Sequence, residues 1–278
     1  MGKPEIYMRH LQVMSVKPKL KGVMLDISGT LHVNYTPLPN AVAALARLRT
    51  TGVKIRFVTN STKLTDDLLF ARLVDMGFEL DRAEIFSSLS AAKQEIQRRN
   101  YRPLLLLEDA ALPQFHDVDQ SEPHDAVVVG LAPSRLDYEH MNRAFQALLN
   151  GADLVGIHRA RYFASSEHEL SLGPGPFVAA LESASGKQAR LVGKPAGAFY
   201  QLALADMGLL DEPEAVAMVG DDVLADLGGG AQDLGLQRFL VRTGKYRSGD
   251  EHKAEVPLDG TFESFAAMVH ELYPLLSR

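Results

Sequence analysis

Short apolar runs alternate along the chain with segments of helical periodicity, and this alternation limits the fold to the α/β class. In the first such segment, Val42, Leu45 and Leu48 follow Pro39 at helical spacing. Strands that alternate with helices form parallel sheets that are covered by those helices. The sequence therefore predicts a Rossmann-like parallel-sheet core. The runs that we expect to form its buried strands are residues 23–25, 53–58, 215–219 and 237–241.

A second region with the same alternating pattern occupies the middle of the chain. Its expected strands are residues 104–107, 126–129 and 154–157, and its expected helices are residues 90–99, 137–150 and 177–184. No linker rich in serine and glycine separates this region from its flanks, and we find no internal repeat. We therefore expect an α/β domain at residues 83–188, inserted into one discontinuous core that is formed by residues 1–82 and 189–278.

The composition excludes several functional classes. The chain has no cysteine, which rules out disulfide scaffolds, cysteine nucleophiles and thiolate metal sites, and which fits a reducing compartment. A net charge of −6 without a basic run argues against a nucleic-acid partner. No apolar stretch approaches the roughly 18 residues of a membrane span, and the N-terminal segment lacks the apolar core of a secretion signal. We expect a soluble cytoplasmic protein that binds neither nucleic acid nor membrane.

Three polar clusters follow apolar strands, at the strand ends where open parallel sheets bind their ligands. They are DISGT at residues 26–30, TN at 59–60 and GDD at 220–222. Two strand ends that carry carboxylates can form an all-oxygen site of the kind that Mg²⁺ prefers. A carboxylate beside that cation can attack phosphorus, because the metal offsets the repulsion between the two anions. Gly29 permits a tight turn whose N–H groups face a phosphate, and Thr59 and Lys194 would supply further phosphate contacts.

These motifs, in this order, resemble the haloacid dehalogenase superfamily of phosphotransferases and phosphatases. The matching positions are residues 26–30, Thr59, Lys194 and residues 220–221 with Asp226, and further shared stretches are residues 173–176 and 241–245. The resemblance covers about residues 20–250. The long insertion between the second and third motifs is typical of the class with a large cap, subclass IIA. The resemblance thus implies that residues 83–188 form an α/β cap, which excludes water and selects the leaving group.

The resemblance also implies a role for each matching acidic residue, with Mg²⁺ as the cofactor. Asp26 matches the nucleophile, which forms an aspartyl-phosphate and binds the metal through its other oxygen. The main-chain carbonyl of Ser28 and the carboxylate of Asp221 match the other metal ligands from the protein. Asp226 and Asp222 are candidates for the acidic residues that support the metal by orienting its bound water.

The remaining candidates would bind the substrate. Thr59 and Lys194 match the groups that hold the transferring phosphoryl, and Lys194 would also neutralise Asp26 against Asp221. Asn60 is a further candidate for phosphate binding, unless it serves to stabilise the turn after the strand. Arg161, together with His158, follows an expected strand of the cap and could reach over the site to an anionic substrate.

One position departs from the family pattern. Most phosphatases of the superfamily carry an Asp two residues after the nucleophile as general acid and base, whereas this chain has Ser28. General acid–base catalysis is typically worth about 10²–10⁴-fold, and a serine hydroxyl supplies it poorly. We therefore expect Ser28 to favour substrates whose leaving groups depart easily, such as phosphoramidates, acyl phosphates, pyrophosphate or aryl phosphates, over sugar-phosphate esters.

The sequence leaves three functions to compare. The expected one is a Mg²⁺-dependent phosphatase that acts on a small phosphorylated molecule. The presence of Ser28 in place of the usual Asp is also compatible with a binding or regulatory protein that retains the site but has little turnover. A dehalogenase, which would use the same Asp without a metal, fits less well because Asp221 and Asp226 suit a cation. The oligomeric state stays open, since relatives with such caps often form homodimers.

Overall fold

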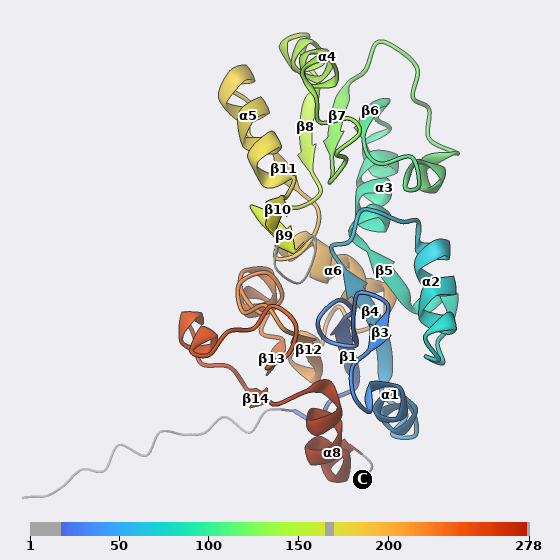
Figure 1. Ribbon diagram of the computed structural model, residues 1–278, viewed down its shortest axis with the longest axis vertical. Coiled ribbons are helices and arrows are strands. Elements are labelled where there is room, and N and C mark those ends of the chain that lie inside the picture. Colours follow the sequence, from blue (N-terminus) through green and yellow to red (C-terminus); the bar gives the residue numbers. More distant parts are fainter. Residues whose placement is uncertain (1–17, 165–169, 277–278) are drawn as a thin grey trace, which may run out of the picture.

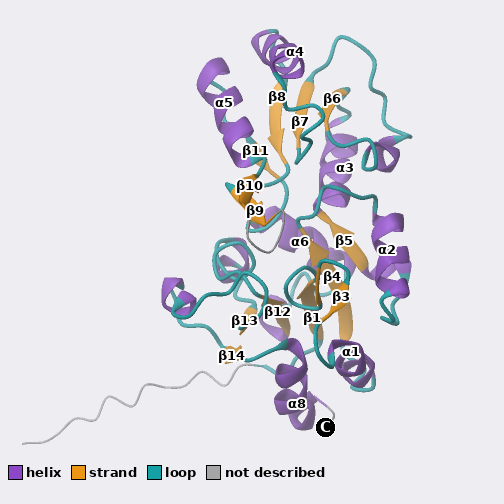
Figure 2. Ribbon diagram, in the orientation of Figure 1, coloured by secondary structure: helices purple, strands orange, loops and turns teal. Residues whose placement is uncertain are grey.

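The computed structural model describes residues 18–164 and 170–276. Within them, a six-stranded and a four-stranded sheet, both parallel throughout, form two α/β units that lie one above the other (Figures 1 and 2). The expected α/β class with a parallel-sheet core is therefore confirmed. The first 17 residues of the expected core, on which the prediction of no secretion signal rests, lie outside the described residues.

The larger sheet has β1 near its centre, in the order β14-β13-β12-β1-β4-β5. Its strands are β1 (Gly22–Asp26), β4 (Lys54–Thr59), β5 (Ile85–Ser87), β12 (Val216–Gly220), β13 (Gln237–Val241) and β14 (Gly260–Phe262). All five residues of β1 are buried, because helices cover both faces of the sheet. Val23 and Leu25 belong to the apolar cluster on one face and Met24 to the cluster on the other, as the alternation of side chains along a strand requires.

Two layers of helices cover this sheet. The first face packs against α1 (Ala41–Arg49), α2 (Asp66–Asp75) and α8 (Phe265–Leu276), and the second against α6 (Gly197–Asp206) and the short α7 (Gly230–Asp233). Helix α2 begins where the sequence indicates, since the Thr65 side chain accepts a hydrogen bond from the Leu68 N–H at 3.2 Å. The helical spacing after Pro39 likewise forms α1, whose Leu45 and Leu48 are buried.

The smaller sheet has the strand order β11-β8-β7-β6. Its strands are β6 (Pro103–Leu106), β7 (Ala126–Val129), β8 (Asp153–Gly156) and β11 (Arg190–Leu191). One face packs against α4 (Tyr138–Leu149) and α5 (Gly175–Ser185), and the other against α3 (Ser88–Arg99). We call this sheet with its helices the cap, and the larger sheet with its helices the core.

Strand pairing moves both expected junctions between core and cap. Residues 85–87, which we expected in the cap, form β5 and pair with β4 of the core sheet. Residues 190–191, which we expected in the core, form β11 and pair with β8 of the cap sheet. Both strands are only two or three residues long, so their apolar pattern is too short to assign them to a sheet. The expected junctions at 83 and 189 were therefore wrong by a few residues.

Short elements complete the structure. They are the hairpin strands β2 (His32–Val33) and β3 (Thr36–Pro37), the antiparallel pair β9 (Tyr162–Ala164) and β10 (Leu170–Leu172), and four 3₁₀ turns at Arg82–Glu84, Leu112–Phe115, Pro213–Ala215 and Asp250–Lys253. None of the helices in the described part of the chain has the length and apolar character needed to cross a membrane.

Direct hydrogen bonds join the two units near the ends of the core strands. The Leu131 N–H of the cap donates to the Thr62 hydroxyl at 3.0 Å, and the Asp66 N–H of the core donates to the Gln114 side-chain oxygen at 3.1 Å. The cap is thus held over the edge of the core sheet at which β1, β4 and β12 end (Figure 1).

Candidate active site

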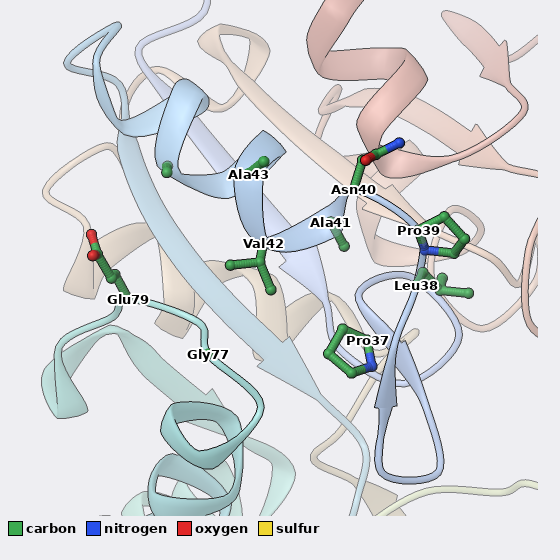
Figure 3. Close-up of a pocket in the computed structure, with 10 residues that line it drawn as sticks. Pro37, Leu38, Pro39, Asn40, Ala41, Val42, Ala43, Gly77 and Glu79 are labelled. Carbon is green, nitrogen blue, oxygen red and sulfur yellow. The ribbon is translucent and has the colours of Figure 1, made fainter.

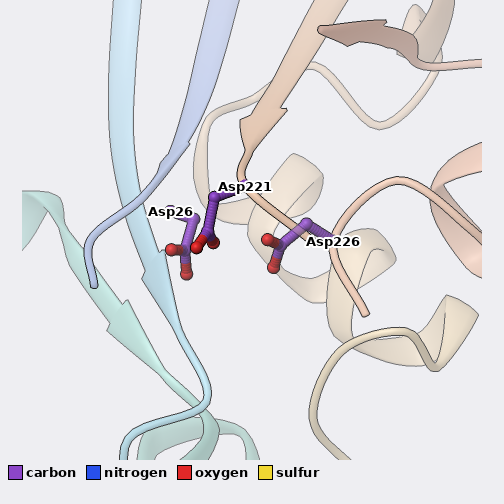
Figure 4. Close-up of side chains that lie close together, drawn as sticks. All are labelled: Asp26, Asp221 and Asp226. Carbon is purple, nitrogen blue, oxygen red and sulfur yellow. The ribbon is translucent and has the colours of Figure 1, made fainter. Parts of the chain in front are cut away.

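Three buried carboxylates meet at the carboxyl end of the core sheet (Figure 4). Asp26 is the last residue of β1, and Asp221 directly follows the neighbouring strand β12, so parallel pairing places both at the same edge. Asp226 returns to this point from the loop after β12. One oxygen from each of the three side chains lies within 4.8 Å of the others. We call Asp26, Asp221 and Asp226 the acidic cluster.

Lys194 bridges two members of the acidic cluster. Its ammonium lies 2.5 Å from Asp26 Oδ1 and 2.7 Å from Asp226 Oδ1, and it also donates to the Val58 carbonyl at 3.3 Å. The side chain is fully enclosed, with 2% of the residue exposed. Burial alone would lower the pKa of Lys194, but Asp226 and Asp26 outweigh it and raise the pKa, so that the ammonium stays charged.

The acidic cluster carries more negative charge than Lys194 can neutralise. Burial and the nearby Asp26 raise the pKa of Asp221 well above its ordinary value. Burial, together with Asp26 and despite Lys194, raises the pKa of Asp226 to about 6. The raised pKa values of Asp221 and Asp226 show that negative charge is crowded in this all-oxygen set, and a divalent cation would relieve the repulsion. The residues present therefore fit the implied Mg²⁺, and Asp26, Asp221 and Asp226 are the side chains that would surround it.

The segment 243–245 ties the loop after β1 to the acidic cluster. The Thr243 hydroxyl donates to the Gly29 carbonyl at 2.5 Å, and the Lys245 N–H donates to Asp221 Oδ2 at 2.6 Å. Gly29 and Gly244 both have positive φ, and a Cβ on either would come within 2.1 Å of Asp221 Oδ2. Only glycine fits at both positions. The sequence showed this segment as a shared stretch but contained no signal for its contacts, one of which joins residues 214 positions apart.

The loop after β1 leaves Ser28 exposed, whereas Asp26 and Thr30 are buried. The Thr30 hydroxyl lies 3.5 Å from Asp26 Oδ2, at the limit of a hydrogen bond. Ser28 forms an isolated bridge with His32 through the main chain. The structure thus places Ser28 in an exposed part of the loop that follows Asp26.

Two expected phosphate-binding residues follow β4. Thr59 is buried at the end of the strand, and its hydroxyl accepts the Ser61 N–H at 3.1 Å. We expected Asn60 to bind phosphate, but its side-chain amide forms hydrogen bonds with the Lys194 main chain. Its Oδ1 accepts the Lys194 N–H at 2.9 Å, and its Nδ2 donates to the Lys194 carbonyl at 2.8 Å. The adjacent Gly193 permits this approach, since a Cβ there would lie 2.6 Å from Asn60 Oδ1. Asn60 is thus engaged in positioning the lysine.

Of the two aspartates that follow Asp221, the structure brings only Asp226 into the cluster. Asp222 instead stabilises its own turn, because its Oδ1 accepts the N–H groups of Leu224 at 3.1 Å and Ala225 at 3.0 Å. Its main-chain N–H donates to Asp226 Oδ2 at 3.1 Å, which fixes the carboxylate of Asp226. Chain spacing could not separate these two residues, since both lie in one short loop.

The two cap residues singled out from the sequence have different surroundings. The main chain of Ile157 accepts the Gly193 N–H at 2.8 Å, which places His158 beside the segment that carries Lys194. Burial and the charges of Lys245 and Lys194 lower the pKa of His158 to about 4. Arg161 is exposed and its guanidinium lies 5.8 Å from the Tyr162 ring centroid; among the described residues, no hydrogen bond or ion pair links it to the acidic cluster.

A separate open pocket lies at the start of α1 (Figure 3). It is lined mainly by Pro37, Leu38, Pro39 and apolar residues of α1, with Glu79 as the one charged residue among those that line it. None of the site residues expected from the sequence borders this pocket. The candidate catalytic side chains of the acidic cluster therefore lie at the edge of the core sheet and not in this pocket.

Comparison with known proteins agrees with this geometry. A family model described as "Haloacid dehalogenase-like hydrolase" matches residues 23–119, and a second HAD-hydrolase-like model matches residues 191–268. The chain is 48% identical to "Haloacid dehalogenase-like hydrolase domain-containing protein 2" of Homo sapiens, over 92% of this chain and 98% of the relative. It is 37% identical to "Phospholysine phosphohistidine inorganic pyrophosphate phosphatase" of Homo sapiens, over 90% and 93%.

A solved structure shares the whole arrangement of core and cap. The p-nitrophenyl phosphatase from Archaeoglobus fulgidus superposes with a TM-score of 0.84 at 27% identity, over 92% of this chain and all of that one. The first family model covers the N-terminal part of the core and extends into the cap, the second covers the C-terminal part of the core, and the sequence identity extends through core and cap alike. The chain is a member of the haloacid dehalogenase-like hydrolase family.

Proposed function

We propose that the protein is a Mg²⁺-dependent phosphatase that hydrolyses a small phosphorylated molecule through an aspartyl-phosphate on Asp26. The observation that carries this proposal is the pairing of Asp26 with Lys194 inside a buried cluster of three carboxylates. The names of two relatives, a pyrophosphate phosphatase and a p-nitrophenyl phosphatase, support the reaction class. We further infer a cytoplasmic location, with which the absence of cysteine is compatible.

Asp26 is the nucleophile in this mechanism. One of its carboxylate oxygens attacks the phosphorus, a new O–P bond forms, and the leaving group departs with the electron pair of the broken bond. Water then attacks the same phosphorus, which releases inorganic phosphate and restores Asp26. A bound Mg²⁺ would supply positive charge that offsets the repulsion between the carboxylate and the phosphoryl oxygens.

Lys194 and Asn60 prepare the nucleophile. The ammonium of Lys194 holds Asp26 Oδ1 at 2.5 Å and supplies positive charge for the transferring phosphoryl, while Asn60 holds the main chain of Lys194 in place. The Thr59 hydroxyl borders the same edge of the sheet and is the neutral group that we assign to the phosphoryl oxygens. The cap excludes water from the acyl phosphate until hydrolysis.

Ser28 limits the substrates in this mechanism. Ser28 is exposed and lies two residues after the nucleophile, and in this proposal it replaces the general acid that would protonate the departing oxygen. Substrates whose leaving groups are stable without that proton lose least by its absence. We therefore assign phosphoanhydrides, phosphoramidates, acyl phosphates and aryl phosphates to this site in preference to alkyl esters.

The deciding experiment is a substrate panel on wild type and Asp26→Asn. The panel contains p-nitrophenyl phosphate, pyrophosphate, phospholysine and a sugar phosphate, each assayed with Mg²⁺ and with EDTA. We expect Mg²⁺-dependent turnover in the wild type and its loss in Asp26→Asn. Asp211→Asn, at an exposed position, is the matched control and should keep full activity.

Each alternative function has its own signature in this panel. Turnover that survives in Asp26→Asn excludes the aspartyl-phosphate mechanism. Activity unchanged by EDTA would point to dehalogenase-like chemistry that needs no cation. Absence of turnover on every phosphate would instead identify a binding protein that retains the family's site.

A further inference from the structure

A second lysine borders the acidic cluster on its open side. The main-chain N–H of Lys245 is fixed on Asp221, so its side chain starts directly beside the cluster. The ammonium lies 3.7 Å from Asp222 Oδ2, and the side chain is 63% exposed. Carboxylates of the site, Asp226 foremost, outweigh the effect of burial and raise the pKa of Lys245. Lys245 therefore presents a fixed positive charge outside the buried pair that Lys194 forms with Asp26.

The cap supplies a neutral hydrogen-bond donor on the same side. His158 is half-buried, and its Nδ1 accepts the Ala160 N–H at 3.2 Å. The proton of the neutral ring is consequently on Nε2, which is left to donate to a ligand. Lys245 and Lys194 both lie close enough for their charges to act on this ring. The cap residue next to His158 contacts Gly193, which precedes Lys194, and the main chain of Lys245 contacts Asp221, so the cap and the core each contribute one of these residues beside the site.

A third lysine does not share this position. Lys253 also lies near Asp222, but its ammonium forms an ion pair at 2.6 Å with Asp250, which belongs to the same 3₁₀ turn. Lys194 is enclosed and bound to two carboxylates. Of these three lysines, Lys245 is therefore the one whose ammonium is both close to the site and accessible to an incoming ligand.

We propose, on the basis of the phosphatase function above, that Lys245 and His158 form a leaving-group subsite that selects a leaving group with negative charge. The substrate class that satisfies this subsite is a phosphoanhydride, of which inorganic pyrophosphate is the simplest. A phosphoramidate of a cationic amine, such as phospholysine, would bring positive charge against Lys245 and is disfavoured.

The reaction balances without a general acid. An Asp26 oxygen attacks one phosphorus of pyrophosphate, and the bond from that phosphorus to the bridging oxygen breaks. The electron pair stays on the bridging oxygen, which leaves as part of inorganic phosphate. The Lys245 ammonium stabilises this developing charge, and His158 donates a hydrogen bond from Nε2 without transferring its proton. The absence of a general acid at position 28 therefore lowers the rate only slightly with this leaving group.

The test compares two substrates that differ in the charge of the leaving group. Lys245→Gln removes the ammonium while its main-chain bond to Asp221 remains. We expect the ratio of kcat/KM for pyrophosphate to kcat/KM for p-nitrophenyl phosphate to fall by about 10- to 100-fold, the usual value of a hydrogen bond to a charged group. Lys245→Arg should keep most of the ratio. Lys187→Gln, a surface lysine that contacts the Gly151 carbonyl, is the matched control and should leave the ratio unchanged.

Variants of the cap residue and a charge reversal complete the test. His158→Leu should lower the same ratio, and His158→Gln, which keeps an N–H donor, should restore part of it. Lys245→Glu should shift the preference from pyrophosphate toward phospholysine. Equal losses on both substrates in Lys245→Gln, or a wild type that prefers phospholysine to pyrophosphate, would overturn the subsite. A wild type that turns over no phosphate with Mg²⁺ would instead overturn the phosphatase function itself.

Discussion

The side-chain amide of Asn60 holds the main chain of Lys194 at both ends of the residue. It accepts the Lys194 N–H at 2.9 Å and donates to the Lys194 carbonyl at 2.8 Å. The two residues are 134 positions apart, and they connect the end of β4 with the start of the segment that leads to α6. The position of the Lys194 ammonium therefore depends on Asn60 as well as on the carboxylates that it contacts.

This contact predicts a kinetic defect in Asn60→Ala. Loss of both hydrogen bonds frees the Lys194 main chain, and a displacement of about 1 Å at a catalytic group can cost roughly 100-fold in rate. We expect kcat/KM to fall by about 10- to 100-fold, with kcat affected more than KM, in steady-state assays on p-nitrophenyl phosphate. Asn150→Ala, at an exposed helix end, is the control. Unchanged kinetics would show that Lys194 is held by its carboxylate contacts alone.

The excess negative charge of the acidic cluster predicts opposite effects of Asp221→Asn with and without metal. Burial and Asp26 raise the pKa of Asp221, so its ionised form destabilises the metal-free fold at neutral pH. Asp221→Asn should raise the melting temperature in EDTA, because the amide keeps an oxygen for the Lys245 N–H. Wild type should gain about 2.7 kcal/mol at a Mg²⁺ concentration of 100 Kd.

Thermal melts of both proteins in EDTA and across a Mg²⁺ titration check this expectation. Asp221→Asn should lose most of the stabilisation by Mg²⁺, and Asp211→Asn should behave as the wild type does. If Mg²⁺ stabilises wild type and Asp221→Asn equally, Asp221 does not contribute to a metal site.

The lowered pKa of His158 predicts that this residue makes stability depend on pH. Its pKa is about 4 in the folded chain and 6.5 in the unfolded chain, so between these values the unfolded chain binds the extra proton. The free energy of unfolding should therefore decline as the pH falls from 6.5 toward 4. His158→Gln removes this contribution and should flatten the dependence in that window. Urea unfolding at pH 4.5, 5.5, 6.5 and 7.5 measures it, and parallel curves for the two proteins would contradict it.

Ser28 predicts a gain of activity by substitution. Ser28→Asp introduces a carboxyl group at the exposed position beside Asp26, where it can protonate a departing alkoxide. We expect turnover of an alkyl phosphate, such as a sugar phosphate, to rise by at least about tenfold, below the 10²–10⁴-fold ceiling of general acid–base catalysis. Ser28→Asn has nearly the same shape without an acid and should show no gain. Equal alkyl-ester rates in wild type and Ser28→Asp would count against the leaving-group argument.

Much of the fold and of the acidic cluster was predictable from the sequence for a local physical reason. Strands buried on both faces are continuous apolar runs, and the carboxyl ends of parallel strands share one edge of the sheet. Asp26 and Asp221 follow such runs directly, so their proximity follows from parallel pairing alone. By contrast, β5 and β11 are too short to carry a pattern, and both junctions of the cap were misplaced.

What only the tertiary structure decided is which side chains meet across long separations in the chain. The amide of Asn60 could serve a local turn, a phosphate or a distant main chain, and only the packing of Gly193 against it selects the last of these. Likewise, the approach of Lys245 to the acidic cluster needs Gly29 and Gly244 to pack against Asp221. By itself, the sequence determined the strands and the residues at their ends, because those follow from local periodicity. The partners of those residues depend on close packing between distant segments, which no local pattern encodes.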